Sequence, residues 1–194
     1  MHDRTINRTT NGTGAVENYN LDELKSLSVQ KNYGDAFKNE TIPTLSETCE
    51  LVNNWNKTHK HKTNLYVDCK AAEAKALINE IKKFNLLKNA VFYGSDDFLI
   101  ALKKVYPKAK VLPALNNSNE MTAKIEKLKP YAFDVRWEIL SDSLVKAIHS
   151  KKIRVFSDAL DLKDTPKNYL KAIKINLDVI QTDKVRSLFE TLLD

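Results

Sequence analysis

Four side chains at the edges of predicted elements could carry acid–base and phosphate chemistry. His2 and Asp3 are adjacent, and Asp68 and Lys70 stand two residues apart in the sequence YVDCK. Histidine titrates near neutral pH and can move a proton in phosphoryl or acyl transfer, while a neighbouring carboxylate orients it or binds a metal ion. Residues two apart on a strand face the same side, so Asp68 and Lys70 could hold a divalent cation and an anionic oxygen together. The other interpretation of that pair is a salt bridge at a strand end.

The remaining histidines and cysteines give weaker signals. His59 and His61 lie among lysines in NKTHKHKTN, where the positive charge opposes cation binding, so a solvated loop is predicted. His149 follows an apolar helical stripe and is predicted to cap the helix or to lie at the core edge. Cys49 and Cys69 stand in unrelated contexts and predict neither a disulfide framework nor a metal cluster.

The composition of the chain limits the classes of protein to which it can belong. The chain has 194 residues and 42% hydrophobic content, which predicts one globular domain over residues 1–194. The net charge of +6 comes from lysines scattered along the chain, a pattern typical of solvated helix faces. Without a basic helix or an aromatic platform, no nucleic-acid partner is expected. No apolar run approaches the roughly 20 residues of a membrane span, so a soluble protein is expected, cytoplasmic or exported.

After residue 63, short runs rich in β-branched and aromatic residues alternate with amphipathic segments at helical period. The predicted strands are 64–70, 89–95, 109–115, 131–137, 152–158 and 178–183. Strand–helix repeats without hairpin signals require parallel strands joined by helices, hence a doubly wound sheet or a (β/α)8 barrel. Residues 1–63 are polar, with short helices predicted at 20–28 and after Pro43. Ser95, Ser118 and Ser141 are predicted helix N-caps.

In parallel α/β folds the ligand lies at the carboxyl ends of the strands. Apart from Asp68 and Lys70, this rule selects short polar groups after the other strands. They are Ser95 with Asp96, Asp134 to Trp137, Ser157 with Asp158, and Thr182 with Asp183, and the same rule selects Pro113.

Several motifs resemble the glycerophosphodiester phosphodiesterase family over essentially the whole chain. The opening MHDRTINRTTNGTG resembles the family's His-Asp segment with its trailing Arg-Thr-Thr-x-Gly-x-Gly, and LDELKSL follows as its L-x-E-L-x-x-L. IPTLSE at 42–47 is similar to the family's Pro-Thr-Leu-Glu signature, and YVDCK stands where the family shows a Glu-x-Lys strand. VIQTD at 179–183 resembles the closing Thr-Asp strand.

The resemblance implies a (β/α)8 barrel of TIM type, in which the six predicted strands correspond to the third through eighth. The single domain is thus expected to lack the first two strands, leaving about six of eight strand–helix units, with 1–40 as a polar excursion loop. The family's His-Arg-Gly and Glu-x-Asp motifs are expected to be missing with those strands. Two unpaired sheet edges would remain, and we expect the chain either to be unstable or to close the gap by self-association or by a distorted barrel.

The family's activity is the hydrolysis of glycerophosphodiesters, small molecules of lipid metabolism, to glycerol 3-phosphate and an alcohol. By resemblance, His2 would be a general acid or base and Lys70 would neutralise a non-bridging phosphate oxygen. Asp68 and Asp3 would bind a divalent cation, Ca²⁺ or Mg²⁺, although the family usually has Glu at the position of Asp68. The family's Trp near the seventh strand is not evident around Phe156. The resemblance therefore does not specify which alcohol is released.

Two functions therefore follow from the sequence. The first is a metal-dependent phosphodiesterase, whose site would be incomplete in this chain alone. The second is a non-catalytic barrel remnant or phosphate-ligand-binding protein, suggested because one aspartate seldom holds a divalent cation tightly when further ligands are expected.

Overall fold

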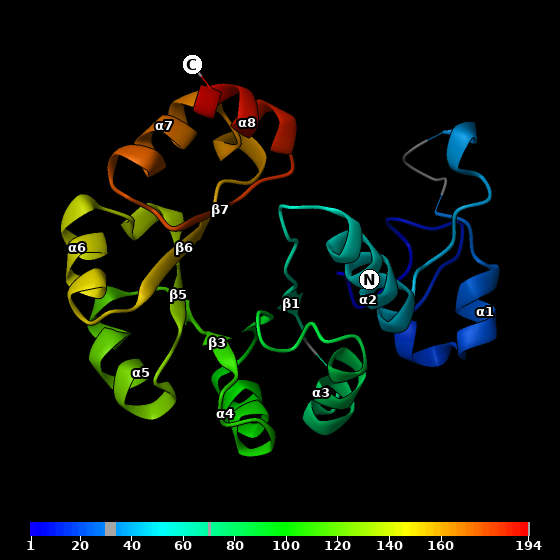
Figure 1. Cartoon of the computed structure of the whole chain (residues 1–194). Coiled ribbons are helices and arrows are strands. Elements are labelled where there is room, and N and C mark those ends of the chain that lie inside the picture. The colour runs from blue at the N-terminus through cyan, green and yellow to red at the C-terminus, as the bar shows by residue number, and fades with distance from the viewer. Residues whose placement is uncertain (30–33, 70, 194) are drawn as a thin grey trace. The chain divides into compact units, whose positions relative to one another are not determined.

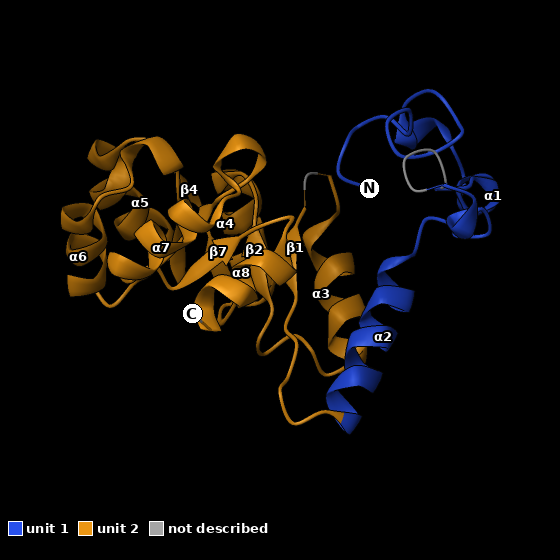
Figure 2. Cartoon of the chain, turned by 90° about the horizontal axis from the view of Figure 1, so that it is seen from above, with its two compact units in different colours: residues 1–58 blue, residues 59–194 orange. Residues whose placement is uncertain are grey.

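The computed structural model describes residues 1–29, 34–69 and 71–193. The chain divides into two units, Met1–Thr58 and His59–Asp194, which are distinguished by colour in Figure 2. The expectation of a single domain over residues 1–194 stays a prediction.

Unit 1 contains two capped helices, α1 (Leu21–Ser26) and α2 (Leu45–Thr58), and the 3-10 turns η1 (Val16–Asn18) and η3 (Asp35–Phe37). At the start of α1 the Asn20 side chain accepts from the Glu23 backbone N–H at 3.0 Å, and the Glu23 carboxylate accepts from the Asn20 N–H at 2.8 Å. This reciprocal pair satisfies two donors that the helix leaves open. Lys25 of α1 and Glu47 of α2 form an ion pair at 2.8 Å. Both predicted helices are confirmed.

Unit 2 alternates strands and helices. Its strands are β1 (Tyr66–Asp68), β2 (Val91–Tyr93), β3 (Lys110–Leu112), β4 (Ala114–Leu115), β5 (Ala132–Val135), β6 (Arg154–Asp158) and β7 (Val179–Gln181). Its helices are α3 (Ala74–Lys83), α4 (Asp96–Val105), α5 (Met121–Leu128), α6 (Asp142–Ser150), α7 (Pro166–Lys174) and α8 (Val185–Leu193). Short 3-10 turns lie at η4 (Ser118–Glu120), η5 (Trp137–Ile139) and η6 (Asp161–Lys163).

All strand pairs are parallel, in the orders β1-β2-β3 and β4-β5-β6-β7. Each of the six predicted runs contains a strand, and the run 109–115 is divided at Pro113. Proline has no N–H to donate to a neighbouring strand, so the ladder is interrupted there. Backbone bonds span the interruption, since Tyr131 donates to Val111 at 3.0 Å and Asp134 donates to the Pro113 carbonyl at 3.1 Å.

The two faces of the strands pack against different cores. Phe133, Val135 and Val155 belong to a buried cluster that includes Val145 and Ile148 of α6. The alternate residues face the other way, into a second cluster made of Val91, Leu112, Ala132 and Phe156. Side chains on a strand alternate between its two faces, so one face is covered by helices and the other is an interior of its own.

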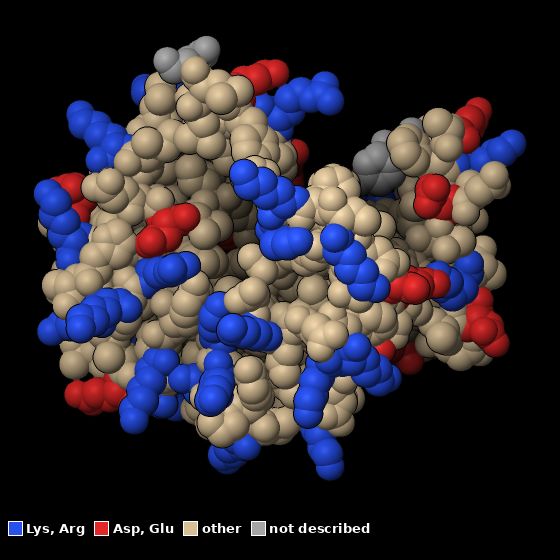
Figure 3. Space-filling view, viewed as in Figure 1, with Lys and Arg blue, Asp and Glu red and all other residues tan. Residues whose placement is uncertain are grey.

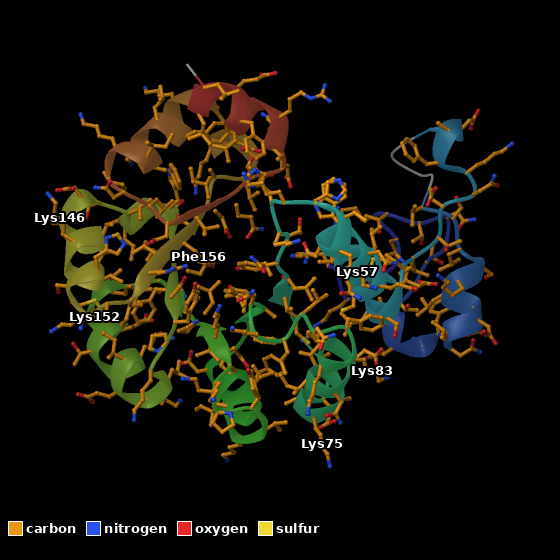
Figure 4. All side chains as sticks on the ribbon, in the orientation of Figure 1. Lys57, Lys75, Lys83, Lys146, Lys152 and Phe156 are labelled. Atoms are coloured by element: carbon orange, nitrogen blue, oxygen red, sulfur yellow. The ribbon has the colours of Figure 1, made fainter. Side chains whose placement is uncertain are left out.

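The strands curve around that interior. Tyr66 of β1 and Phe156 of β6 are not on neighbouring strands, yet their rings stack with centroids 6.5 Å apart. Figure 1 shows helices α3 to α8 on the outside of the strands, and Figure 4 shows Phe156 inside them. The fold is therefore of the α/β barrel type that the resemblance predicts.

Lys110 and Arg154 stand at the amino ends of β3 and β6, and both lie 5.0 Å from the centroid of the Tyr131 ring. Arg154 also donates a hydrogen bond to the Tyr131 hydroxyl. The ring face attracts both cations and so offsets their mutual repulsion. The amino end of the interior is thus lined by one aromatic ring and two cations.

Two of the three predicted helix N-caps are confirmed. Ser95 and Ser141 accept from the third residue of α4 and α6, as predicted. The prediction for Ser118 is wrong, because the shorter turn η4 begins there and the Asn117 side chain caps it.

Figure 3 shows Lys and Arg spread over the face in view with acidic residues between them. Within the described ranges, no helix has both the length and the apolar character needed to cross a bilayer.

Unit 2 exposes apolar side chains at one edge of its sheet. Among the described residues, β7 pairs with β6 alone, and Val185, Phe189 and Leu192 of α8 are exposed, Phe189 by 61%. Exposed apolar stripes beside an open strand favour association. We predict that the chain forms dimers through this edge, detected by sedimentation velocity over a concentration series.

Phe189→Lys should shift the population toward monomer, because the new charge must be desolvated in the contact. The control is Leu162→Lys, at a position that is 96% exposed in η6. A chain that sediments as a monomer at every concentration would contradict the prediction.

Candidate active site

Three aspartates face the interior of unit 2 at the carboxyl ends of its strands. Asp158 lies two residues after Phe156, Asp134 two after Ala132, and Asp68 two after Tyr66. Because Phe156, Ala132 and the Tyr66 ring all face the interior, the strand period turns the three carboxylates to the same side. The carboxyl end is where parallel α/β folds bind their ligands.

These carboxylates act on one another. Burial raises the pKa of Asp134 to about 7, and the charges of Asp158 and Asp68 contribute to the rise. The pKa of Asp158 is also raised, first by burial and then by Asp68, while the charge of Lys163 offsets part of the rise. Burial and the same aspartates raise the pKa of Tyr93. The carboxyl end of the interior is therefore partly dry and negatively charged, although the chain as a whole is basic.

Two pockets open at this end. The first has a volume of about 280 Å³ and is lined mainly by polar residues, among them Tyr93, Asn116, Asp134 and Lys163. The second, of about 390 Å³, is mainly apolar and lies between Tyr66, strands β6 and β7, and Phe189 of α8. Asp158 belongs to the wall of both pockets.

A buried hydrogen-bond network fixes the end of β7. The carboxylate of Asp164, which is 2% exposed, accepts from the Tyr169 hydroxyl, from Thr182 Oγ1 at 2.5 Å and from the Asp183 N–H at 3.0 Å. Burial alone would raise the pKa of Asp164, but these hydrogen bonds outweigh it and the pKa is lowered. The network connects the loop before α7 to the Thr182–Asp183 pair that follows β7. It shows why that pair stands at a fixed position at the mouth.

In unit 1, His2, Asp3 and Arg8 form a cluster. His2 Nδ1 lies 2.8 Å from Asp3 Oδ1, and Arg8 donates to Asp3 through Nε at 2.7 Å and through a terminal nitrogen at 3.0 Å. These hydrogen bonds, from Arg8 first and His2 second, hold the pKa of the Asp3 carboxyl well below its usual range. The His2 side chain is 69% exposed. The backbone loop is closed by the antiparallel bridge between Thr5 and Ala15.

The structure brings some of the predicted site residues together. His2 and Asp3 contact each other in unit 1, while Asp68 ends β1 in unit 2. Lys70 lies outside the described residues. His149 lies in the last turn of α6, and its Nε2 lies 2.8 Å from Asp178 Oδ2, in keeping with its predicted place at the edge of the core. Sequence reasoning selects Asp134 and Asp158 only by their strand ends, and their coupling across the interior leaves no trace in the local sequence.

A divalent cation is implied by the resemblance, and the described residues do not form a complete site for one by themselves. No three His, Cys, Asp or Glu side chains in the described part of the chain are grouped so that they could hold a metal ion. The Asp3 oxygens already accept from Arg8 and contact His2. The assignment of Asp68 and Asp3 as metal ligands therefore stays a prediction.

Comparison with known proteins gives a consistent result. The model of the glycerophosphoryl diester phosphodiesterase family matches residues 1–187. A glycerophosphodiester phosphodiesterase of Caldanaerobacter subterraneus is 27% identical over 97% of this chain and 77% of the relative. Glycerophosphodiester phosphodiesterase 1 of Bos taurus is 34% identical, over 39% of this chain and 22% of the relative.

Solved structures show the same fold. The phosphodiesterase of Oleispira antarctica in complex with the product sn-glycerol-3-phosphate has a TM-score of 0.83 at 20% identity, over 100% of this chain and 78% of that one. The glycerophosphodiester phosphodiesterase of Agrobacterium tumefaciens has a TM-score of 0.82 at 16% identity, over 97% of this chain and 78% of that one.

The raised pKa of Asp134 predicts a pH-dependent stability. The folded pKa of about 7 lies above the ordinary value of 3.8, so the folded state holds the proton more tightly. The free energy of unfolding should therefore fall as the pH rises from about 4 to 7. Asp134→Asn removes the contribution of this carboxyl group. Its effect on the free energy of unfolding, measured by urea denaturation, should be more stabilising at pH 8 than at pH 4 by about 1 kcal/mol or more. An effect that is equal at both pH values would contradict the prediction.

The Asp164 network predicts a large stability effect. Asp164→Ala leaves the hydroxyls of buried Tyr169 and half-buried Thr182 without the carboxylate that accepts from them, so the free energy of unfolding should fall by about 3 kcal/mol. Asp97→Ala, at a side chain that is 98% exposed, is the control and should change stability by less than about 1 kcal/mol. Equal effects of the two substitutions, measured by thermal and urea denaturation, would show that the network is not needed.

Proposed function

The chain belongs to the glycerophosphoryl diester phosphodiesterase family, and on that premise we propose that it hydrolyses glycerophosphodiesters to sn-glycerol 3-phosphate and an alcohol. The observation that carries the proposal is the match of the family model to residues 1–187. The Oleispira antarctica phosphodiesterase, whose fold is similar, was solved with sn-glycerol-3-phosphate as its product.

His2 is proposed as the residue that moves a proton to or from a bridging oxygen of the phosphodiester. Its Nδ1 is held by the Asp3 carboxylate at 2.8 Å, so Nε2 is the ring nitrogen that would exchange the proton. Asp3 stays ionised at working pH because Arg8 and His2 hold its pKa low. A fixed carboxylate on one ring nitrogen sets both the tautomer and the orientation of the imidazole. In this role Asp3 is a positioning residue.

Lys70 is proposed to neutralise a non-bridging phosphate oxygen as negative charge develops on it, and Asp68 to be a metal ligand. Both assignments come from the resemblance of YVDCK to the family's Glu-x-Lys strand. The position of Asp68 at the carboxyl end of β1 supports its part of the proposal, because that end of the strands faces the pockets. The divalent cation, Ca²⁺ or Mg²⁺, belongs to the same proposal.

A second candidate is a protein that binds phosphorylated ligands without turnover. It is favoured by the finding that no group of three potential ligands for a metal ion exists among the described residues. Calorimetric titration of the chain with Ca²⁺ separates the two functions. Tight binding supports the hydrolase, whereas phosphate binding without cation binding supports the second candidate.

We predict that His2→Ala lowers the release of sn-glycerol 3-phosphate from glycerophosphodiesters about 100-fold or more, since general acid–base catalysis contributes at least that factor. The measurement is coupled detection of sn-glycerol 3-phosphate with Ca²⁺ or Mg²⁺ present. His61→Ala, in the lysine-rich loop, is the matched control and should retain activity. Full activity of the His2 variant would refute the assigned role.

A further inference from the structure

The amino end of the strands of unit 2, opposite the three aspartates, gathers positive charge. Six segments lead from a helix into the next strand at this end, and they are 59–65, 84–90, 106–110, 129–131, 151–154 and 175–178. They contain eight lysines and one arginine but a single acidic residue, Asp178, and outside them acidic residues slightly outnumber Lys and Arg. The nine cations, which we call the basic face, are Lys60, Lys62, Lys88, Lys108, Lys110, Lys129, Lys151, Lys152 and Arg154.

The parallel strands explain why lysines that are scattered in the sequence meet in the fold. The strands of unit 2 run in one direction, so all six segments reach the same end. Figure 3 looks onto this end of unit 2, where Lys and Arg side chains predominate over Asp and Glu. Helix dipoles favour cations in the last turn of a helix, but Lys108, Lys110 and Arg154 lie beyond the helix ends. Helix stability therefore does not account for the whole face.

Most cations of the basic face have no counter-charge on the chain. The sole acidic residue is engaged, since Asp178 lies 2.8 Å from His149 Nε2 and accepts from the Val155 N–H at 2.8 Å. Burial, and then the charge of Lys129, lower the pKa of Lys103 in the last turn of α4. Among the described residues, ion pairs are formed by none of Lys88, Lys108, Lys110, Lys129, Lys151, Lys152 and Arg154. An anionic partner would relieve the repulsion between these cations.

The arrangement fits an extended layer of phosphates better than a nucleic acid. The aromatic residues of the six segments, Phe84, Tyr106 and Tyr131, are all partly buried, and the Tyr131 ring already contacts Lys110 and Arg154. These segments thus offer no exposed ring for stacking on a base. The helices reach this end only with their last turns, so none of them can lie along a groove of a duplex. An anionic bilayer needs neither feature, because it attracts lysines through charge alone.

We propose that the basic face of unit 2 binds the surface of a bilayer that contains anionic phospholipids. The contact is electrostatic, because none of the large apolar side chains that the described chain exposes lies in the six segments. The pockets at the carboxyl ends of the strands lie at the opposite end of unit 2 and stay open to molecules in solution. Binding of this kind does not depend on the hydrolysis proposed above, so a chain that binds the bilayer and hydrolyses nothing refutes only the proposed function.

The first test measures cosedimentation of the full chain with vesicles of equimolar phosphatidylglycerol and phosphatidylcholine, and with vesicles of phosphatidylcholine alone. We expect binding to the anionic vesicles only. Raising NaCl from about 0.1 M to about 0.5 M should release the chain, because salt screens charges that are exposed to solvent. Equal binding to both kinds of vesicle, or binding to neither, would overturn the proposal.

Substitutions then assign the binding to the basic face. Lys108→Gln with Lys151→Gln removes two exposed charges of the face and should weaken binding to the anionic vesicles about 20-fold, since each lysine near such a surface contributes about fivefold. The matched control is Lys75→Gln with Lys167→Gln, which removes two exposed charges from the first turns of α3 and α7 and changes the net charge equally. The control should bind nearly as the unmodified chain does. Circular dichroism verifies that both variants are folded, and equal weakening by the two pairs would overturn the proposal.

Other anionic partners give different results. Inorganic phosphate that displaces the chain from the vesicles at constant ionic strength would show a discrete phosphate site and overturn the proposal. Fluorescence anisotropy with a labelled DNA duplex is measured in the same buffer. Binding to the duplex that is tighter than binding to the vesicles, and that is lost in the Lys108 and Lys151 variant, would make this a nucleic-acid surface and overturn the proposal as well.

Discussion

The alternation of side chains along parallel strands is the constraint on which the site depends. Once Phe156 and Ala132 are buried in the interior, Asp158 and Asp134 are directed to its carboxyl end. They take this position even though partial burial of their carboxylates is unfavourable. A shift of one residue in either strand would turn the carboxylates toward the helices and bring Ser157 or Phe133 inward. The hydrophobic pattern of the strands therefore fixes the register and, with it, the chemistry of the mouth.

The two carboxylates at the carboxyl end of the interior lower the stability of the fold. Asp134 and Asp158 repel each other in a partly dry site, and neither forms an ion pair with a cation among the described residues. The opposing contribution comes from well-satisfied parts nearby, such as Asp164 with its three donors and the apolar cluster between β5, β6 and α6. Functional sites commonly hold unfavourable charge arrangements that the rest of the fold supports.

The sequence predicts the strands well because their signal is local. Alternating apolar runs predict six strands, and all six are found, with Pro113 dividing one for a reason that is also local. Closure into a barrel is not predictable from periodicity, because it depends on contacts such as that of Tyr66 with Phe156, far apart in the chain. The choice of a barrel over a doubly wound sheet comes from the family motifs.

The site is predictable only where its members are neighbours in sequence. His2 and Asp3 are adjacent, and their contact follows from that, whereas the ion pair of Asp3 with Arg8 depends on how the loop folds back. The coupling of Asp134 with Asp158 joins residues on two strands, and no spacing rule reveals it. Short polar groups after strands mark candidate positions, and only the folded chain shows which of them share a pocket.

The interior of the strands is solid below the aspartates. Val91, Leu112, Ala132 and Phe156 fill it, and Tyr131 lies between them and the amino end together with Lys110 and Arg154. In the described part of unit 2, Asp158 is instead reached from two pockets, one mainly polar and one mainly apolar, because its side chain belongs to the wall of both. A molecule that contacts this carboxylate from one pocket changes the charge that the other pocket presents, so the two pockets cannot be occupied independently.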